Sequence, residues 1–295
     1  MRTVRLTTTA FGGPHVATPT GMSARLHLHL ARLNRMRLTP VRPKADWRED
    51  LEEEMAIRGM EIDWVESERA RIGPDALRAP RDAARFLAWF EQLQHDGPGQ
   101  HDPLFTWLAE RATLHQMRWF LRQEIGGEAG YEDLVALTQV RMPSQAKLEL
   151  ARSFWDGMTG PTLAPITAAL ELGKLHDDLV WEARALGNLT CALAANRRYA
   201  FHSLGALGVV ALLAPAREGC VLAGLERLHL APKARAYFER TSNHAWSRKI
   251  LGPLVASDPD LAPLIAEGAL LRLEAGARCF VRYREELDHV HSNAA

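Results

Sequence analysis

Apolar residues recur at helical spacing through almost the whole chain, and this pattern constrains the fold more than any other feature. From Pro103 onward they fall at steps of three and four in consecutive segments, separated by short turns rich in Gly, Pro and Asp. No stretch alternates polar and apolar residues for long enough to build a sheet. The sequence therefore predicts an all-α protein, with helices at 23–36, 45–72, 82–93, 103–125, 131–140, 144–158, 162–172, 178–195, 198–214, 217–229, 232–251 and 258–287.

The same pattern predicts how the 295 residues are organised. Ser23 is a good helix N-cap, and "DGPG" at 96–99 is a clear break. We expect a flexible N-terminal tail (1–22), accessory helices packed on the core (23–102), a main helical bundle (103–288) and a frayed C-terminal tail (289–295).

Charge and composition exclude several classes of partner. Lys+Arg and Asp+Glu balance at 36 each, so no positive field points to nucleic acid or to an anionic membrane. No run approaches the ~20 apolar residues that span a bilayer, and the N-terminus lacks the apolar segment of a secretory signal. The cysteines, Cys191, Cys220 and Cys279, have no zinc-binding spacing and are typical of a reducing compartment. We predict a cytoplasmic protein.

Two positions on predicted core helices do not fit an ordinary apolar face. Leu150, Phe154 and Met158 step at helical spacing, yet Gly157 beside this stripe has no side chain. Conversely, Glu124 extends the apolar face of "LHQMRWFLRQE" (114–124). A carboxylate on such a face must be paired, protonated or bound to metal, because burying it bare is costly. A salt-bridged core glutamate near a helix end is the structural alternative.

Several motifs occur in an order that resembles a known family, and the similarity covers about residues 104–285. The motifs are "FLRQEIGGEAGYEDLVALTQV" (120–140), "AKLELARSFWD" (146–156), "ALGN" (185–188), "NRRYAFHSLGALGVV" (196–210), "GLERLHL" (224–230), "YF" (237–238), a Trp at 246 with "PLV" (253–255), and "GALLRLEAG" (268–276). Together they resemble the iron-containing redox enzyme family of heme-oxygenase-like diiron oxidases and oxygenases. The resemblance implies a bundle of about seven core helices around two irons, which are held by carboxylates and histidines. It also implies dioxygen chemistry on small amino acids, fatty acids or guanidine-type substrates, often in natural-product pathways.

Carried over position by position, this ligand set is mostly missing. The resemblance places its first glutamate at Glu124, which is present, and its other ligands at positions occupied by Gly157, Thr167, Ala211 and Thr241. The segment from Tyr237 to Trp246 is too short for the last aspartate and histidine, with His244 as a candidate substitute. One carboxylate cannot neutralise two ferrous ions. We therefore predict no metal and no cofactor, with iron as the alternative.

Other clusters of metal-binding residue types have structural explanations. Asp residues near a helix start are favoured by the N-terminal partial charge, and alternating histidines are hard to hold on one helix face. We predict no metal role for His176, Asp177 and Asp178, for Asp288, His289 and His291, or for His27 and His29. No GxGxxG, P-loop, GxSxG or HExxH motif occurs.

The emptied site is predicted to remain as a pocket. Its lining would be Glu124, Gly157, Thr167, Ala211 and Thr241, with small side chains in place of ligands. Glu124 would then need either a cation or a raised pKa. We expect that cation to be one of Arg198, Arg240 and Arg248.

Two functions of different classes follow. The first is a pseudoenzyme, which binds a small molecule or peptide or serves as a partner subunit in a natural-product pathway, as a homodimer or as a heterodimer with a related enzyme. The alternative is an oxidoreductase that acts on an amino-acid-like or peptide substrate. It would use either a non-standard iron site or no metal cofactor. In the second case the candidate groups are His202, Tyr199 and Arg198. The acidic helix at 45–72 is either an interface or a solvated face.

Overall fold

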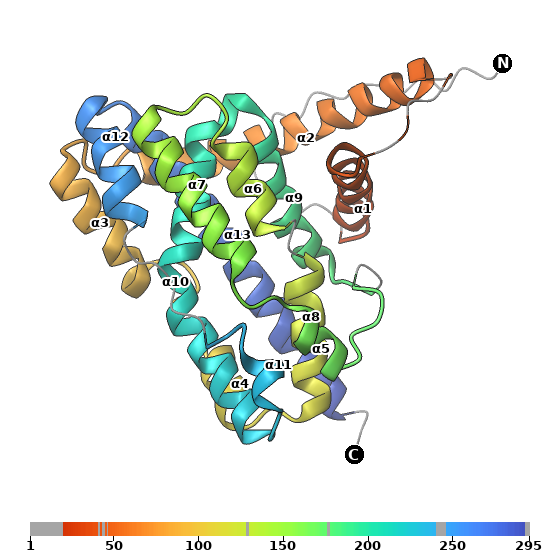
Figure 1. Cartoon of the computed structure of the whole chain (residues 1–295). Helices are drawn as coiled ribbons and strands as arrows, with labels where there is room; N and C mark the ends of the chain where they lie inside the picture. Colours follow the sequence, from red (N-terminus) through yellow and green to blue (C-terminus); the bar gives the residue numbers. More distant parts are fainter. Residues whose placement is uncertain are drawn as a thin grey trace.

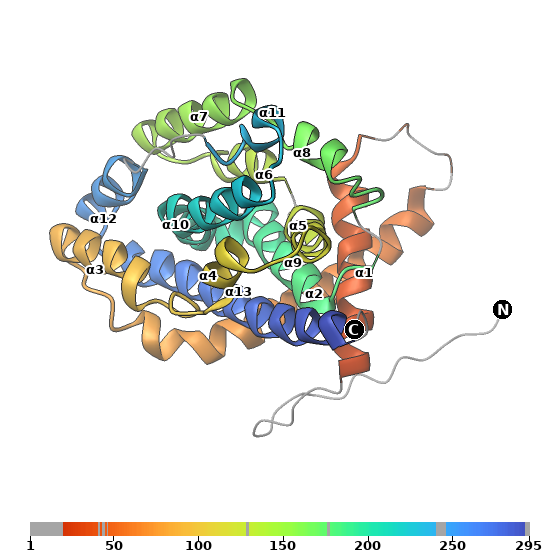
Figure 2. The same ribbon diagram turned by 90° about the horizontal axis from the view of Figure 1, so that it is seen from below.

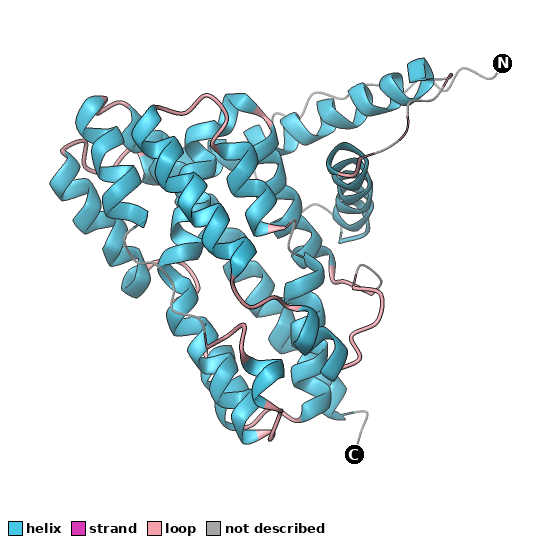
Figure 3. Cartoon of the chain, in the orientation of Figure 1, coloured by secondary structure: helices cyan, strands magenta, loops and turns pink. Residues whose placement is uncertain are grey.

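The fold is helical throughout the part of the chain that is described. The computed structural model describes residues 20–40, 42, 45, 47–127, 130–175, 178–239 and 246–292. Within these ranges no strand occurs (Figures 1 and 3). The predicted all-α fold class is therefore confirmed. Most of the predicted N-terminal tail lies outside the described residues.

The first helix begins at Thr20, before the predicted N-cap Ser23. The elements, in chain order, are α1 (Thr20–Leu38), α2 (Trp47–Ala76), α3 (Ala83–Asp96), α4 (Leu104–Glu110), α5 (Leu114–Gly127), α6 (Tyr131–Thr138), α7 (Ser144–Thr159), α8 (Ala164–Ala169), α9 (Trp181–Ala195), the 3-10 turn η1 (Arg197–Tyr199), α10 (Ala200–Arg227), α11 (Pro232–Arg235), the π-helical turn η2 (Ser247–Leu251), α12 (Gly252–Ser257) and α13 (Leu261–Ser292).

Helix α10 lies in the middle of the bundle, surrounded by other helices (Figure 2). It crosses α13 with the two backbones in contact. A Cβ on Gly205 would lie 1.8 Å from the carbonyl oxygen of Ile265, and one on Gly268 would lie 1.8 Å from that of His202. No side chain fits at either position, so these two glycines set the close approach of the two longest core helices.

Helix α10 also corrects a sequence-based prediction. A break was expected between 198–214 and 217–229, but one helix runs through Pro215. Proline removes the N–H that would bond to the carbonyl of Ala211, four residues earlier. Contacts of α10 with helices on several sides compensate for the lost hydrogen bond, so the helix continues through Pro215. Helix propensity alone therefore predicted a helix end where there is none.

A second correction concerns the predicted helix 103–125, which is two helices, α4 and α5. Thr113 and Gln116 form a capping box at the start of α5. The backbone N–H of Thr113 donates to Oε1 of Gln116 at 2.8 Å, and the N–H of Gln116 donates to Oγ1 of Thr113 at 3.3 Å. This reciprocal pair starts a new helix where the apolar spacing continues unbroken.

The segment Arg197–Arg227 is long and apolar enough to cross a membrane, with a mean hydropathy of 1.6. Length and composition are the only grounds for that possibility. The core helix of a soluble bundle passes the same test, and α10 holds the central position in this bundle (Figure 2). The finding is therefore weak support for a membrane span.

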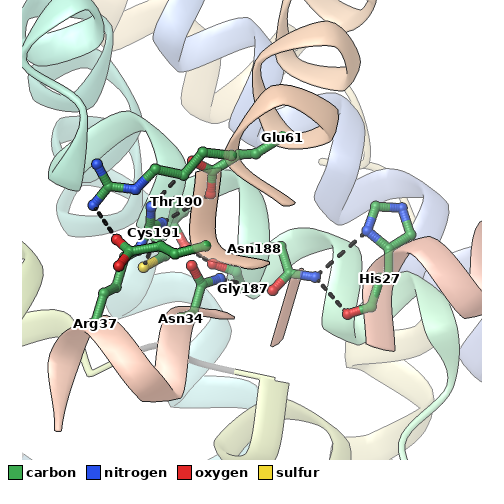
Figure 4. A network of polar contacts seen from close by, with 10 residues as sticks. His27, Asn34, Arg37, Glu61, Gly187, Asn188, Thr190 and Cys191 are labelled. Carbon is green, nitrogen blue, oxygen red and sulfur yellow. Dashed lines mark hydrogen bonds and ion pairs between the residues drawn. The ribbon is translucent and has the colours of Figure 1, made fainter. Parts of the chain in front are cut away.

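The N-terminal helices pack on the bundle through polar contacts as well as apolar ones. Helix α1 lies on α9, and α2 lies on α13. In the buried network of Figure 4, Nδ2 of Asn34 donates to Oδ1 of Asn188 at 2.8 Å, and Nδ2 of Asn188 donates to the carbonyl of His27 at 2.9 Å. Arg37 of α1 donates two hydrogen bonds to Glu61 of α2, at 3.0 and 2.9 Å. Specific hydrogen bonds thus fix the position of α1.

Candidate functional site

Glu124 lies on α5 and faces the interior beside α10 and α13. It is partly buried and lines two adjoining cavities. Burial, followed by the charge of Glu124, raises the pKa of the Tyr283 phenol well above its ordinary value. Tyr283 therefore stays protonated and offers an O–H donor at the wall of one of these cavities.

Two arginines that the sequence argument did not name line a cavity together with Glu124. Arg217 of α10 and Arg272 of α13 line the same cavity as Glu124. The guanidinium of Arg217 stacks on the rings of Phe105 and Phe280, with distances to the ring centroids of 5.4 and 4.8 Å. Its Nη2 atom and Nε of Arg272 are buried without a hydrogen-bond partner among the described residues. Burial and then the like charge of Arg272 lower the pKa of Arg217 to about 10, so it remains a cation at neutral pH.

The arginines predicted to pair with Glu124 lie elsewhere. Arg248 is exposed on η2, and its Nε donates to Oε1 of Glu91 at 2.9 Å. Arg198 is exposed on η1, where its charge helps to lower the pKa of Glu66. Arg240 lies outside the described residues. The pairing prediction is wrong for Arg198 and Arg248, because the turns η1 and η2 point these side chains outward.

Gly157 and Ala211 line one cavity together, and Glu124 is not part of its lining. The space beside Gly157 is not empty, however. A Cβ at this position would meet Cγ and Oε1 of Glu132 at 2.8 Å. Glu132 of α6 thus places its carboxylate where a side chain of residue 157 would stand. A side chain at residue 157 would therefore require the flexible end of Glu132 to move.

Thr167, one of the two threonines of the predicted pocket, lies away from the cavities. The hydroxyl of Thr167 donates to the carbonyl of Leu163 at 2.9 Å, within its own stretch of chain. Thr167 lines none of the cavities described here. Thr241 lies outside the described residues.

Three cavities meet at Val210 in the middle of α10. Their volumes are about 40 Å³ beside Tyr283, about 120 Å³ beside Arg217 and about 230 Å³ beside Gly157. Glu218 and Tyr237 line both of the larger ones. The centre of the bundle is therefore hollow, with mainly apolar walls and a few polar groups, which is the usual character of a small-molecule site.

The donor set at this centre does not fit a pair of irons. Among the described residues, no three His, Cys, Asp or Glu side chains gather closely enough to hold a metal ion. Glu124, Glu132 and Glu218 approach the cavities from different sides, and two arginines stand next to Glu124. A diiron bundle site needs several carboxylates together with histidines.

The described members of the other predicted clusters line none of these three cavities. His27 is buried and His29 is exposed, so they face opposite sides of α1. Asp178 is in a loop, where its carbonyl accepts a hydrogen bond from Nε2 of Gln123 at 3.2 Å, and Asp288 is exposed. His176, Asp177 and His244 lie outside the described residues, as do the side chains of His289 and His291.

The groups considered for chemistry without a metal cofactor do not converge on the hollow centre. His202 is buried, with Nε2 3.6 Å from Oε2 of Glu267. The hydroxyl of Tyr199 donates to Oε1 of Glu66 at 2.6 Å. Both side chains face α2 and α13, and neither lines the three cavities. The three cysteines are free, and burial raises the pKa of each thiol, as expected for inert residues.

Sequence reasoning missed Arg217, Arg272 and Glu132, although a usable signal existed for the arginines. Arg217 lies four residues after Leu213 and four before Val221, on the buried face of α10. The spacing argument that selected Glu124 selects Arg217 in the same way. Glu132 gave no such signal, because its place beside Gly157 depends on how α6 packs on α7.

Comparison with known proteins gives one match. Residues 118–277, more than half of the chain, match the model of the family described as iron-containing redox enzyme. No match was found among curated proteins or among solved structures. The matched segment contains α9, α10 and most of α13, the helices around the hollow centre.

Proposed function

The chain belongs to the family of iron-containing redox enzymes, and from that premise we propose that it is a non-catalytic member, which binds a small molecule at the centre of its bundle. Membership of this family confirms the resemblance that the sequence motifs carry. It also confirms the expected heme-oxygenase-like helical bundle. The proposal goes further, to the loss of the diiron centre and the use of its space for a ligand.

One observation carries this proposal: the cations beside the retained Glu124 are the guanidinium groups of Arg217 and Arg272. In a diiron member, carboxylates would balance two dications at this place. Here two fixed positive charges already stand there, and adding dications would bring like charges together in a poorly solvated space. The arginines thus support a site that has exchanged metal for protein cations.

The walls of the hollow centre support binding of a small organic molecule. The cavity of about 120 Å³ is lined by Phe120, Leu121 and other apolar side chains beside the two arginines. A dry cavity of roughly 150 Å³ accommodates a benzene-sized group. A ligand with an apolar body of that size and an acceptor group near Nη2 of Arg217 would satisfy the buried donor.

Metal analysis is the direct test. The full chain is purified from iron-supplemented cells, and its iron content is measured by elemental mass spectrometry. We expect far less than one iron per chain, whereas about two irons per chain would overturn the proposal. The variant Gly157→Glu with Thr167→His should bind no more iron, because Ala211 offers no ligand and Glu132 already fills the space beside residue 157.

Ligand release tests the other half of the proposal. The purified protein is denatured, and the released small molecules are compared by mass spectrometry between the wild type, Arg217→Met and Arg248→Met. We expect a compound that the wild type and the exposed Arg248→Met control release and that Arg217→Met lacks. If all three release the same compounds, Arg217 has no role in binding.

A second candidate function is oxidation through a non-standard iron site. Glu132 favours it, because its carboxylate occupies the position that a side chain of residue 157 would take. In this case iron would bind to the wild type and be lost in Glu132→Gln. Iron bound equally by both proteins would exclude this site.

Several properties stay predictions. They are a cytoplasmic location, a place in a natural-product pathway, and a dimer with itself or with a related enzyme. The three free cysteines support a reducing compartment.

A further inference from the structure

The first half of α2 is a helix with little support from the described part of the chain. Between Trp47 and Met60 only Ile57 is buried, and this half of α2 projects beyond the bundle (Figure 1). Trp47, Leu51 and Met55 follow one another at four-residue spacing, with exposed fractions of 52%, 44% and 64%. An isolated stretch of helix is only marginally stable in water, and an apolar stripe along it marks an interaction surface.

The outer face of α1 exposes apolar residues too. Met22 and Leu28 are 55% and 50% exposed, and Met36 is 36% exposed. The exposed arginines Arg25 and Arg35 lie on the same side of the helix. We call the two faces together the arm surface, which comprises Met22, Arg25, Leu28, Arg35 and Met36 of α1 with Trp47, Glu49, Leu51, Glu52 and Met55 of α2.

The two halves of the arm surface carry opposite charges. Helix α1 contains four arginines and no acidic residue, whereas residues 47–56 contain five acidic residues and one arginine. Within the chain, these segments meet through Arg32 and Glu53, which are exposed and 4.0 Å apart. In the described part of the chain, no ion pair engages Arg25, Arg35, Glu49 or Glu52.

We propose that a second copy of this chain covers the arm surface, with the acidic half of α2 in each copy packed on the basic face of α1 in the other. A two-fold interface is made by the same surface on both subunits. A surface that carries an acidic helix and a basic helix, each with exposed apolar residues, is complementary to itself under such a rotation. This proposal is independent of the ligand at the bundle centre.

Charge reversal on each half tests the proposal. The mass of the full chain is measured by size-exclusion chromatography with light scattering, and we expect twice the 32.9 kDa of one chain. Arg25→Glu with Arg35→Glu leaves α1 with two arginines and two glutamates, and Glu49→Lys with Glu52→Lys leaves residues 47–56 with three acidic and three basic residues, so each variant removes the net charge of one half. Each variant alone should dissociate at a concentration at least about tenfold higher than the wild type does.

Mixing the two variants gives the decisive result. In a mixed dimer, one contact keeps the wild-type pairing of acidic and basic halves, and in the other the introduced glutamates of one copy face the introduced lysines of its partner. Dimers with one copy of each variant should therefore form at lower concentration than dimers of either variant alone. Met158→Asp on α7 is the control, because Met158 is 59% exposed and lies outside the arm surface. A monomeric wild type, a dimer that neither reversal weakens, or a mixture that stays monomeric would each overturn the proposal. Circular dichroism verifies that every variant is helical.

Discussion

Arg37 and Arg217 are both buried arginines, but their surroundings differ. Arg37, where α1 docks on the bundle, donates two hydrogen bonds to Glu61 and one to the sulfur of Cys191 at 3.2 Å (Figure 4). Arg217, at the hollow centre, stacks on Phe105 and Phe280, and no ion pair engages it among the described residues, although Nε of Arg37 and Nη2 of Arg217 both lack a hydrogen-bond partner there. One guanidinium is held by a carboxylate and the other by aromatic rings.

This difference separates stability from function. Removing one partner of a buried ion pair is costly, because the other charge is left buried and unpaired. A buried cation without a carboxylate partner has no such pair to break, and a bound ligand is one group that can satisfy it. The docking site of α1 is therefore expected to lose stability when its charges are altered, and the bundle centre is expected to tolerate the same kind of change.

The largest effect is expected for Glu61→Gln. Glu61 is nearly fully buried, with its side chain only 4% exposed, and the change leaves Arg37 charged and without its carboxylate. We expect the free energy of unfolding to fall by about 3 to 5 kcal/mol. Urea denaturation followed by circular dichroism measures this change.

Glu53→Gln is the matched control on the same helix. Glu53 faces Arg32 at 4.0 Å, and both side chains are exposed. An exposed pair of this kind contributes less than about 1 kcal/mol. Equal losses for Glu53→Gln and Glu61→Gln would show that burial of the pair is not what fixes α1.

A somewhat smaller effect is expected from pH at the same docking site. His27 lies between Trp64 and Trp181, with ring centroids 4.7 and 5.6 Å away. Burial lowers its pKa from 6.5 to about 4. Between these values the unfolded chain binds more protons than the folded chain, so stability is complete above pH 6.5 and is lost as the pH falls toward 4. The contribution of His27 over this range is at most roughly 3 kcal/mol.

The measurement compares the pH dependence of the free energy of unfolding in the wild type and in His27→Gln. The variant should show a shallower loss between pH 6.5 and 4. His29→Gln, an exposed position on the same helix, should keep the wild-type slope. A wild-type slope in His27→Gln would assign the acid sensitivity to other groups.

Much of the fold was open to prediction because it depends on local patterns. Apolar spacing of three and four fixed the helical class and the order of the helices, and the family motifs fixed the bundle. The errors arose where distant contacts override local preference. Pro215 predicts a break, yet α10 continues through it under contacts from several sides. The backbone contact at Gly205 and Gly268 is also invisible in a sequence, since it needs two helices at once.

Individual residues of the candidate site could be predicted only where the spacing of residues within one helix determines which way a side chain points. Glu124 lines one cavity, and Ala211 and Gly157 line another. The partner of Glu124 was assigned wrongly, because the turns around Arg198 and Arg248 determine where those side chains point. Glu132 beside Gly157 depends on the contact between α6 and α7, which no single-helix argument reaches.

The smallest effect on stability, and the one that most sharpens the comparison, is expected for Arg217→Met. Methionine matches the length of the side chain and keeps contact with Phe105 and Phe280, while the buried charge and its unpartnered Nη2 atom disappear. Replacing a buried charge by an apolar side chain of similar volume is often neutral or stabilising by about 1 to 4 kcal/mol. We therefore expect unchanged or increased stability in urea denaturation, together with loss of the bound compound. A destabilisation as large as that of Glu61→Gln would mean that Arg217 belongs to the framework of the fold, and the contrast between the two buried arginines would fail.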